Sequence, residues 1–175
     1  VILGAGRIGS SLARNLSNSN YEVCIVDEDK SKLSELEDKL DIMTVEGSAS
    51  HLNTLKKSGL NEDTIVLAVT SNDEVNIVAC QIAKKAFDVK KTICRFRDNS
   101  YFGKLEIFGE GVIDIPISPE DEITTHLKEL IDHPGANQIE SFANGKVKLV
   151  SVKAKKKGKL VGRELKGIKE DMPDI

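Results

Sequence analysis

The chain has 175 residues, 30% of them charged, and a formal net charge of −3 at pH 7. This length allows one good core and the start of a small second domain. The charge balance argues against a general attraction to nucleic acid or anionic lipid, and no apolar run approaches the roughly 20 residues that a membrane span needs. Three cysteines, Cys24, Cys80 and Cys94, lie in separate apolar runs without paired ligand spacing. We therefore expect free buried thiols in a reducing cytoplasm and no metal site.

Short β-branched runs alternate with segments of helical periodicity from the first residue onward. The runs predict six strands, at residues 1–3, 21–27, 42–47, 64–70, 92–96 and 111–117. The helical segments are expected to turn one apolar side inward, comprising Ile8, Leu12, Leu16, Leu33, Leu36, Leu40, Ile77, Ala83 and Ala86. Strands that alternate with helices in this way predict an α/β fold with a doubly wound parallel sheet, here over residues 1–117.

A further helix is expected after the sixth strand. Ser118 suits its N-cap, Pro119 its first helical position, and Asp121 the capping-box position. Its apolar stripe comprises Ile123, Leu127, Leu130 and Ile131. The segment His133-Pro134-Gly135 ends it, so residues 118–134 are expected to link two domains.

Residues 135–175 predict the incomplete start of a domain of a different class. The dipeptide Asn144-Gly145 suits the two-residue turn of a β-hairpin. An irregularity is expected near Val150, and the second strand is expected to bury Val147, Leu149, Val152 and Ala154. The chain begins within a strand, without an initiator Met, and ends without a terminal element, so we expect a fragment of a longer protein.

The first strand runs into a glycine-rich segment, Gly4-Ala5-Gly6-Arg7-Ile8-Gly9, that opens a helix. In such a segment Gly4 permits the tight turn, Gly6 lets the backbone approach a pyrophosphate, and Gly9 allows close packing of helix on strand. The anion would meet unpaired N–H groups at the positive end of the helix. Because glycine-rich turns have many causes, a turn that holds no phosphate is the alternative.

An acidic residue follows at the separation that nucleotide binding requires. Asp27 ends the second strand, 18 residues beyond Gly9. A carboxylate there binds ribose hydroxyls and repels a 2′-phosphate, and the following Glu28 and Asp29 offer no arginine to receive one. The sequence therefore favours NAD or NADH over NADP, while ATP and ADP stay open. Asp27 could instead cap the next helix, a role that Asp29 or Ser31 could fill equally well.

Further ligand groups are expected after later strands, because open parallel sheets bind ligands outside their carboxyl ends. The candidates are Gly47, Ser48, Thr70, Ser71 and Arg95. Arg95 is the most specific of them, since a guanidinium in an apolar strand is costly without an acceptor and its fork of donors suits phosphate. The alternative is an arginine whose stem lies on the sheet edge and whose head reaches water.

The sequence predicts no catalytic residues. A dehydrogenase needs a proton-transfer residue beside the nicotinamide, and His51, His126 and His133 are all expected on helices or their ends, away from such a pocket. The Tyr-x-x-x-Lys pair of short-chain dehydrogenases is missing, because Leu105 stands four residues after Tyr101. We expect a nucleotide-binding protein that is not an enzyme.

Several stretches resemble the Trk-type potassium-uptake regulators, whose nucleotide-binding module is called the RCK or KTN domain. They are GAGRIG, IVDED, EGSAS, LAVTSNDEVNIVAC, ICRFRDNSYF and IDIPISPE. The acidic pair Asp73-Glu74 with Asn76 is more specific than any glycine motif. The segment KLVGRELKGI is similar to the opening of the C-terminal RCK subdomain. Ser48 departs from the pattern, because the family often has an acidic residue after this glycine.

The resemblance implies a Rossmann domain, a crossover helix and the start of an RCK C-terminal subdomain. It implies a cytoplasmic regulatory subunit at the inner face of the cell membrane. Two chains would form a dimer through the crossover helix, and the dimers would assemble into a ring. The ring would gate a membrane-embedded potassium transporter subunit when NAD(H) binds. The alternatives are the cofactor domain of an NAD-dependent oxidoreductase and the RCK domain of a potassium channel or antiporter. The basic run at residues 153–159 could face a membrane or form a solvated strand end.

Overall fold

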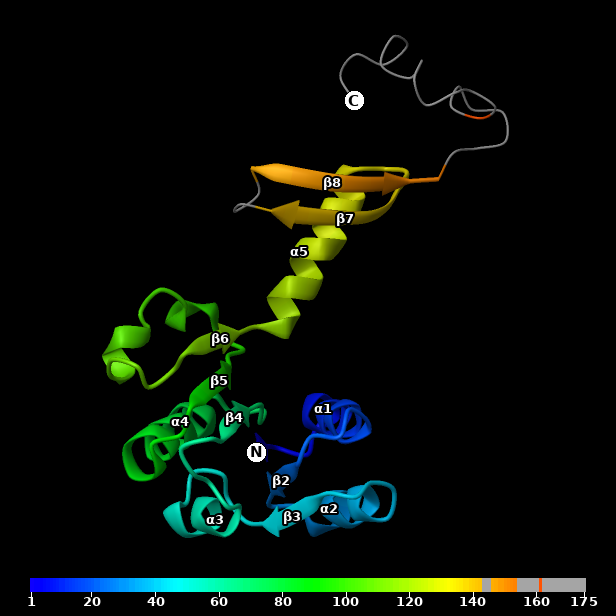
Figure 1. Ribbon diagram of the computed structural model, residues 1–175. Helices are drawn as coiled ribbons and strands as arrows, with labels where there is room; N and C mark the ends of the chain where they lie inside the picture. Colours follow the sequence, from blue (N-terminus) through cyan, green and yellow to red (C-terminus); the bar gives the residue numbers. More distant parts are fainter. Residues whose placement is uncertain (143–145, 154–160, 162–175) are drawn as a thin grey trace. The chain divides into compact units, whose positions relative to one another are not determined.

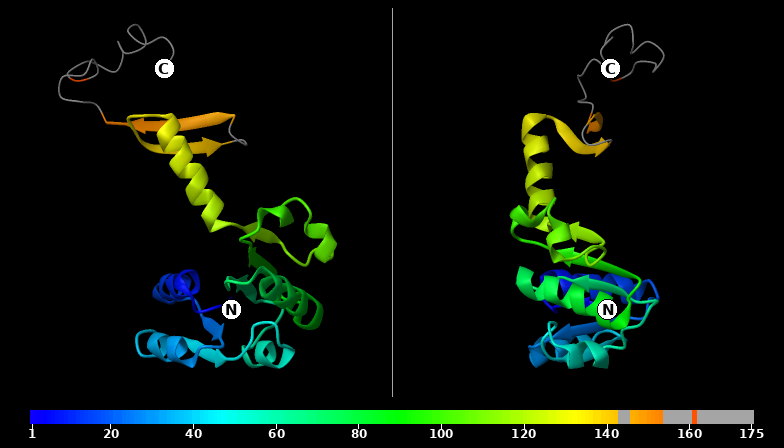
Figure 2. Two further views of the ribbon diagram at one scale, coloured as in Figure 1. Left: turned by 180° about the vertical axis from the view of Figure 1, so that it is seen from behind. Right: turned by 90° about the vertical axis from the view of Figure 1, so that its left-hand side faces the viewer.

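The computed structural model describes residues 1–142, 146–153 and 161. The chain divides into two compact units, Val1–Glu120 and Asp121–Ile175, and the first of them carries the glycine-rich segment. In the first unit a six-stranded parallel sheet is flanked by helices (Figures 1 and 2). The predicted doubly wound α/β fold is therefore confirmed.

Five of the six strands are shorter than the runs that predict them, and the strand at residues 91–95 has the predicted length but begins one residue earlier. The six strands are β1 (Ile2–Leu3), β2 (Cys24–Asp27), β3 (Met43–Glu46), β4 (Ile65–Ala68), β5 (Lys91–Arg95) and β6 (Ile115–Ile117). The strand order is β3-β2-β1-β4-β5-β6, so the connections change direction at β1. The helices of this unit are α1 (Arg7–Asn18), α2 (Lys30–Glu37), α3 (Leu52–Lys57) and α4 (Asp73–Phe87).

Two separate cores form because successive side chains of a strand point to opposite faces of the sheet. Ile2 and Ile25 enter the core that α1 and α2 cover, whereas their neighbours Leu3 and Val26 enter the core that α3 and α4 cover. All strands run parallel, so their carboxyl ends lie at one edge of the sheet. Any ligand site that uses several strand ends must lie along this edge.

One of the expected inward positions is wrong. Leu40 packs partly against the core as expected, although it lies beyond α2, which ends at Glu37. Ala86 is exposed, because the inward side of α4 passes from Ala83 to Phe87. A shift of one position in a helix turns a side chain by about 100°, which is enough to move it from core to solvent.

Between β5 and β6 the described chain has two short 3-10 helices, η1 (Asn99–Tyr101) and η2 (Leu105–Phe108), instead of the α-helix that strict alternation would place there. They surround the buried ring of Phe96, whose centroid lies 5.4 Å from that of Tyr101 and 6.4 Å from that of Phe108. This aromatic cluster fixes the chain directly after the end of β5.

The helix α5 (Pro119–Asp132) begins directly after Ser118, so Ser118 stands at the predicted N-cap position, but within the described chain its side chain makes no capping hydrogen bond. Its hydroxyl is buried and has no hydrogen-bond partner among the described residues. The backbone N–H of Phe96 donates to the Ile117 carbonyl at 2.8 Å, so the β5–β6 ladder extends to the residue before Ser118. Ser118 is thus buried at the end of β6 without capping the helix that follows.

The second unit contains most of α5 (Pro119–Asp132) and a two-stranded antiparallel sheet of β7 (Ala136–Phe142) and β8 (Val147–Val152). Glu129 of α5 joins helix and sheet, because it accepts from the Ser141 hydroxyl at 2.6 Å and lies 3.3 Å from the Lys148 ammonium. Because β7 and β8 pair antiparallel, the predicted hairpin is confirmed. Its predicted turn at residues 144–145 lies outside the described residues.

The expected buried face of β8 is wrong for the residues that the structure describes. Val147, Leu149 and Val152 are 58–63% exposed, and Ile139 on β7 is the buried residue of the pair of strands. The irregularity also lies elsewhere, between Ala136 and Gln138. Alternation of apolar residues predicts which face of a strand is apolar. It does not predict whether another part of the same chain packs against that face. Ala154 and all but Lys153 of the basic run lie outside the described residues.

Candidate functional site

The glycine-rich segment forms a tight turn between β1 and α1. Gly4 has φ +106°, a conformation that favours glycine, and a Cβ there would lie 3.0 Å from the backbone of Thr70. A Cβ on Gly9 would lie 1.8 Å from the Gly4 carbonyl oxygen. Gly4 and Gly9 are thus needed for packing the turn and the helix against the sheet.

Gly6 has a different environment. It is the N-cap of α1, no side chain caps this end of the helix, and a Cβ on Gly6 would meet no atom within 4 Å. Arg7 and Ile8 form the first turn, with Arg7 exposed and Ile8 packed partly against the core. The positive end of this 12-residue helix therefore has open space beside Gly6, because glycine has no side chain to fill it.

Asp27 lies against this turn from the end of β2. Its carboxylate accepts a hydrogen bond from the Ala5 N–H at 2.6 Å and another from the Asp29 N–H at 2.9 Å. The Lys32 ammonium lies 3.8 Å away, and the Asp27 side chain is 16% exposed. Asp29, not Asp27, caps α2, because its carboxylate accepts from the Ser31 N–H at 3.0 Å. Asp27 is thus held toward the glycine-rich turn.

The end of β3 joins the same edge. The Gly47 N–H donates to the Asp27 carbonyl at 2.9 Å, and Gly47 has φ +149°. A Cβ on Gly47 would lie 2.7 Å from the Thr54 hydroxyl oxygen, so this glycine packs the loop onto α3. Ser48 follows, with its hydroxyl 3.2 Å from that of Ser50.

Thr70 after β4 is held by a residue that the predicted site did not include. The Asn76 side-chain oxygen accepts from the Thr70 N–H at 3.0 Å and from its hydroxyl at 2.7 Å. The Asn76 amide nitrogen donates to the Arg95 carbonyl at 3.0 Å. Asn76 is fully buried, and it ties the end of β4 to the end of β5. The polar groups of Thr70 are therefore engaged within the protein, and Ser71 is the residue whose side chain is exposed.

Arg95 reaches across the same strand ends. Its guanidinium donates to the Thr70 carbonyl at 3.1 Å and pairs with the carboxylate of Glu120, and the side chain is 11% exposed. The head of this arginine thus meets an acceptor inside the protein rather than bulk water. The Arg95 guanidinium holds the pKa of the Glu120 carboxyl below its usual value, although partial burial acts in the opposite direction.

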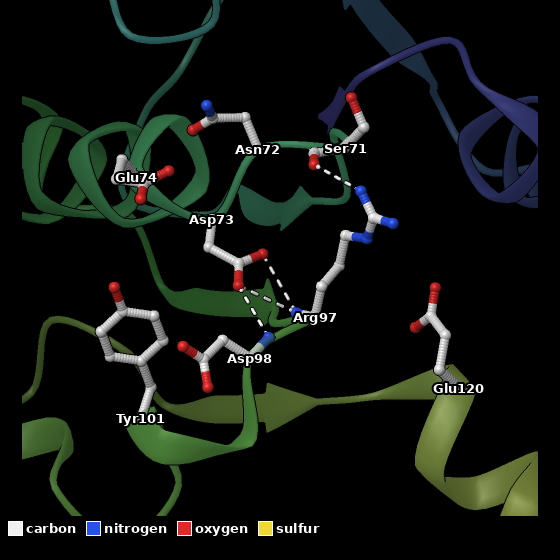
Figure 3. A pocket seen from close by; sticks show the side chains of 8 residues that line it. All are labelled: Ser71, Asn72, Asp73, Glu74, Arg97, Asp98, Tyr101 and Glu120. Carbon is white, nitrogen blue, oxygen red and sulfur yellow. Dashed lines mark hydrogen bonds between the residues drawn. The ribbon is translucent and has the colours of Figure 1, made fainter.

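A pocket of about 450 Å³ lies beside these strand ends (Figure 3). It is lined by Ser71, Asn72, Asp73, Glu74, Arg97, Asp98, Tyr101 and Glu120. The Asp73 carboxylate accepts from the backbone N–H groups of Arg97 and Asp98, each at 3.0 Å, and so fixes the chain after β5 (Figure 3). The sequence signal for the role of Asp73 in fixing this loop is the Asp73-Glu74 pair with Asn76. These residues carry the family resemblance, but they are not among the predicted site residues.

The residues predicted from the glycine motif and the strand ends form one continuous edge. Ala5 contacts Asp27, and Gly4 packs against Thr70, which in turn accepts from Arg95. Gly47 extends this edge on the side of Asp27. The arrangement offers uncapped helix amides for an anion, a nearby carboxylate for hydroxyl groups and a guanidinium at the far end.

The sequence profile of the TrkA-N domain matches residues 1–119. The chain belongs to the TrkA-N domain family. The Trk system potassium uptake protein TrkA of Halomonas elongata is 42% identical over 177 residues, which cover 100% of this chain and 39% of the relative. The chain thus spans well under half the length of the curated relatives that it matches.

Solved structures share the fold of this TrkA-N domain. The TrkA-N domain of the inner membrane protein ybaL from Escherichia coli has a TM-score of 0.66 at 18% identity, covering 74% of this chain and 93% of that one. The GsuK channel bound to NAD has a TM-score of 0.60 at 19% identity, covering 72% of this chain and 22% of that one.

The other expectations concern metals, thiols and membranes. Within the described part of the chain, no three His, Cys, Asp or Glu side chains are grouped as a metal site would need. All three cysteines are buried and free, and burial raises the pKa of the Cys24 thiol to about 11. None of the helices described here is both long and apolar enough to cross a membrane.

Proposed function

We propose that this TrkA-N domain binds NAD or NADH and belongs to a cytoplasmic regulatory subunit of a potassium-uptake system. The observation that carries the proposal is the placement of Asp27 against an uncapped helix start, with open space at Gly6. Residues Gly4 to Ile8 would surround the pyrophosphate, with the backbone N–H groups at the start of α1 as its donors, and Asp27 would receive the adenosine ribose. ATP and ADP share these groups and are the alternative ligands.

The charge around Asp27 supports the choice of NAD over NADP. Glu28 and Asp29 follow it, and the cation beside it is Lys32, which also lies 3.3 Å from Asp29. A ribose 2′-phosphate would approach these carboxylates without a dedicated arginine, and the repulsion would cost binding free energy.

The domain is proposed to regulate rather than to catalyse. His51 precedes α3, whereas His126 and His133 belong to the second unit, so none of the three lies among the predicted site residues. Family membership and the potassium-uptake name of the Halomonas relative support a membrane-embedded potassium transporter subunit as the partner. Nucleotide binding biases such a partner only if the two states of the assembly differ in affinity for the nucleotide.

A dimer through α5 completes the proposal, as the first step toward a ring. Ile123, Leu127 and Ile131 are 54–75% exposed in the single chain, which leaves an apolar stripe along the helix. Contiguous exposed apolar surface is typical of protein–protein interfaces, which supports the assignment of this stripe to a dimer.

Calorimetric titration of the protein with NADH, NAD, NADP, ATP and ADP tests the nucleotide assignment. We expect saturable heats with NADH or NAD and much weaker binding of NADP. Equal affinity for NADP would contradict the role of Asp27, and absence of heat with all five nucleotides would contradict the function as a whole.

A further inference from the structure

The Arg95 guanidinium is only partly satisfied by its present partners. One terminal nitrogen donates to the Thr70 carbonyl and the other pairs with Glu120. The Nε atom is buried and has no hydrogen-bond partner among the described residues. A buried donor without an acceptor is costly, so this arrangement leaves part of the binding capacity of the guanidinium unused.

The Glu120 carboxylate pairs with Arg95 but is partly exposed to solvent. Its side chain is 50% exposed, so its ion pair with Arg95 is screened by solvent and contributes modestly. Glu120 belongs to the first turn of α5, directly after the strand β6 that pairs with β5. The pair therefore joins the end of β5 to the start of the helix that carries the exposed apolar stripe.

Arg95 and the glycine-rich turn adjoin the same residue, Thr70. The Thr70 carbonyl that Arg95 binds belongs to the residue whose backbone packs against Gly4 of the glycine-rich turn. A phosphate could accept from Nε and a terminal nitrogen together, in the bidentate geometry that guanidinium groups prefer. Such a ligand would satisfy the Nε donor that Glu120 leaves unpaired.

We propose that Glu120 competes with the nucleotide's phosphate for Arg95, so that the carboxylate holds the guanidinium in the empty site and is displaced when the nucleotide binds. This rests on the proposed function, and it assigns the regulation of that site. Because coupling is reciprocal, whatever stabilises the Arg95–Glu120 pair weakens nucleotide binding, and nucleotide binding releases the first turn of α5.

The first test compares NADH affinity, measured by calorimetry, in the wild type and four variants. Glu120→Gln removes the competing charge and should tighten NADH binding about twofold to fivefold, the factor that corresponds to a partly exposed ion pair. Glu122→Gln, an exposed carboxylate of the same helix that does not line the pocket, is the matched control and should leave the affinity unchanged. Arg95→Gln should weaken binding, and in that background Glu120→Gln should have no further effect.

The second test measures the pKa of the Glu120 carboxyl by NMR with and without saturating NADH. We expect the pKa, which Arg95 lowers in the empty site, to rise toward its usual value in the complex. A residue with a merely structural role would show no such shift.

The outcomes separate the two proposals. If the wild type binds none of NADH, NAD, ATP and ADP, the proposed function itself is overturned. If the wild type binds NADH but Glu120→Gln binds it equally well or more weakly, or if the Glu120 pKa does not rise on binding, only the competition is overturned.

Discussion

Individual residues of the glycine-rich turn have separable roles. Gly9 allows α1 to approach β1, whereas Gly6 leaves space at the helix start, so the same kind of substitution should have opposite consequences at the two positions.

Gly6→Val should remain folded and lose measurable NADH binding. The Gly6 φ of −71° is accessible to valine, and the new side chain would extend into the open space where a pyrophosphate is proposed to lie. Calorimetry gives the affinity, and circular dichroism with thermal unfolding verifies the fold. Unchanged affinity would refute the assignment.

Gly9→Ala should instead destabilise the domain. Its Cβ would overlap the Gly4 carbonyl oxygen, and relieving an overlap of this size in a packed interior costs about 1–3 kcal/mol or more. Urea unfolding measures the loss. A variant as stable as the wild type would show that α1 can move away from β1 freely.

Asp27→Ala should reduce NADH affinity by about 1–3 kcal/mol, the size of a lost charge-assisted hydrogen bond, and should relax the discrimination against NADP. Asp29→Ala is the matched control, since it removes a neighbouring carboxylate that caps α2 but does not contact Ala5. Equal losses in both variants would mean that general charge, not the position of Asp27, sets the affinity.

Helices and strands could be predicted from the sequence where the pattern that indicates them lies within a few neighbouring residues. Alternating runs and helical stripes depend on neighbouring residues, so all six strands and α1, α2 and α4 were expected. The contacts that order the site join residues far apart in the chain, such as Asn76 with Thr70 and Arg95, and Arg95 with Glu120. No local pattern encodes such pairs. The buried face expected on β8 failed for a related reason, because its exposed residues have no cover within the described chain.

A partly exposed ion pair between α4 and the chain before β6 makes the stability of the fold depend on pH. The Lys84 ammonium lies 2.9 Å from the Asp114 carboxylate, which also accepts from the Thr92 N–H at 2.7 Å. Burial raises the pKa of Asp114, but the Lys84 ammonium and the Thr92 donors outweigh this and leave the pKa below its usual value. The ionised carboxylate is thus favoured in the folded state.

Asp114→Asn should therefore cost about 0.5–1 kcal/mol of unfolding free energy at pH 7, since solvent screens a partly exposed pair. The stability that Asp114 contributes is complete above its unfolded pKa of about 3.9 and is lost as the pH falls through the lower folded pKa. Urea unfolding at neutral and acidic pH should show the wild type converging on the variant in acid. Glu35→Gln, which breaks an exposed pair with Lys39, should change little at either pH. A difference that persists in acid would exclude ionisation as its source.

At the scale of the whole molecule, the proposed dimer depends on the apolar stripe of α5. Burying its three exposed apolar side chains and the exposed part of Leu130 could contribute on the order of 5–8 kcal/mol before association costs, enough for a stable dimer. Ile123→Glu with Leu127→Glu should give a folded monomer that still binds NADH, because both positions are exposed in the single chain. Thr125→Glu, on another side of the helix, is the control. Sedimentation of a wild-type monomer at tens of micromolar, or of a dimeric double variant, would exclude this interface.

The central claim is that the nucleotide binds along the edge formed by the glycine-rich turn, Asp27 and Gly47. An NMR titration of the backbone amides with NADH tests it most directly, because each amide reports its own surroundings. We predict saturable shifts at residues 5–9 and at Gly47, with one common affinity, and loss of all of them in Gly6→Val. Absence of shifts at residues 5–9, or saturable shifts confined to the pocket around Tyr101, would contradict the account.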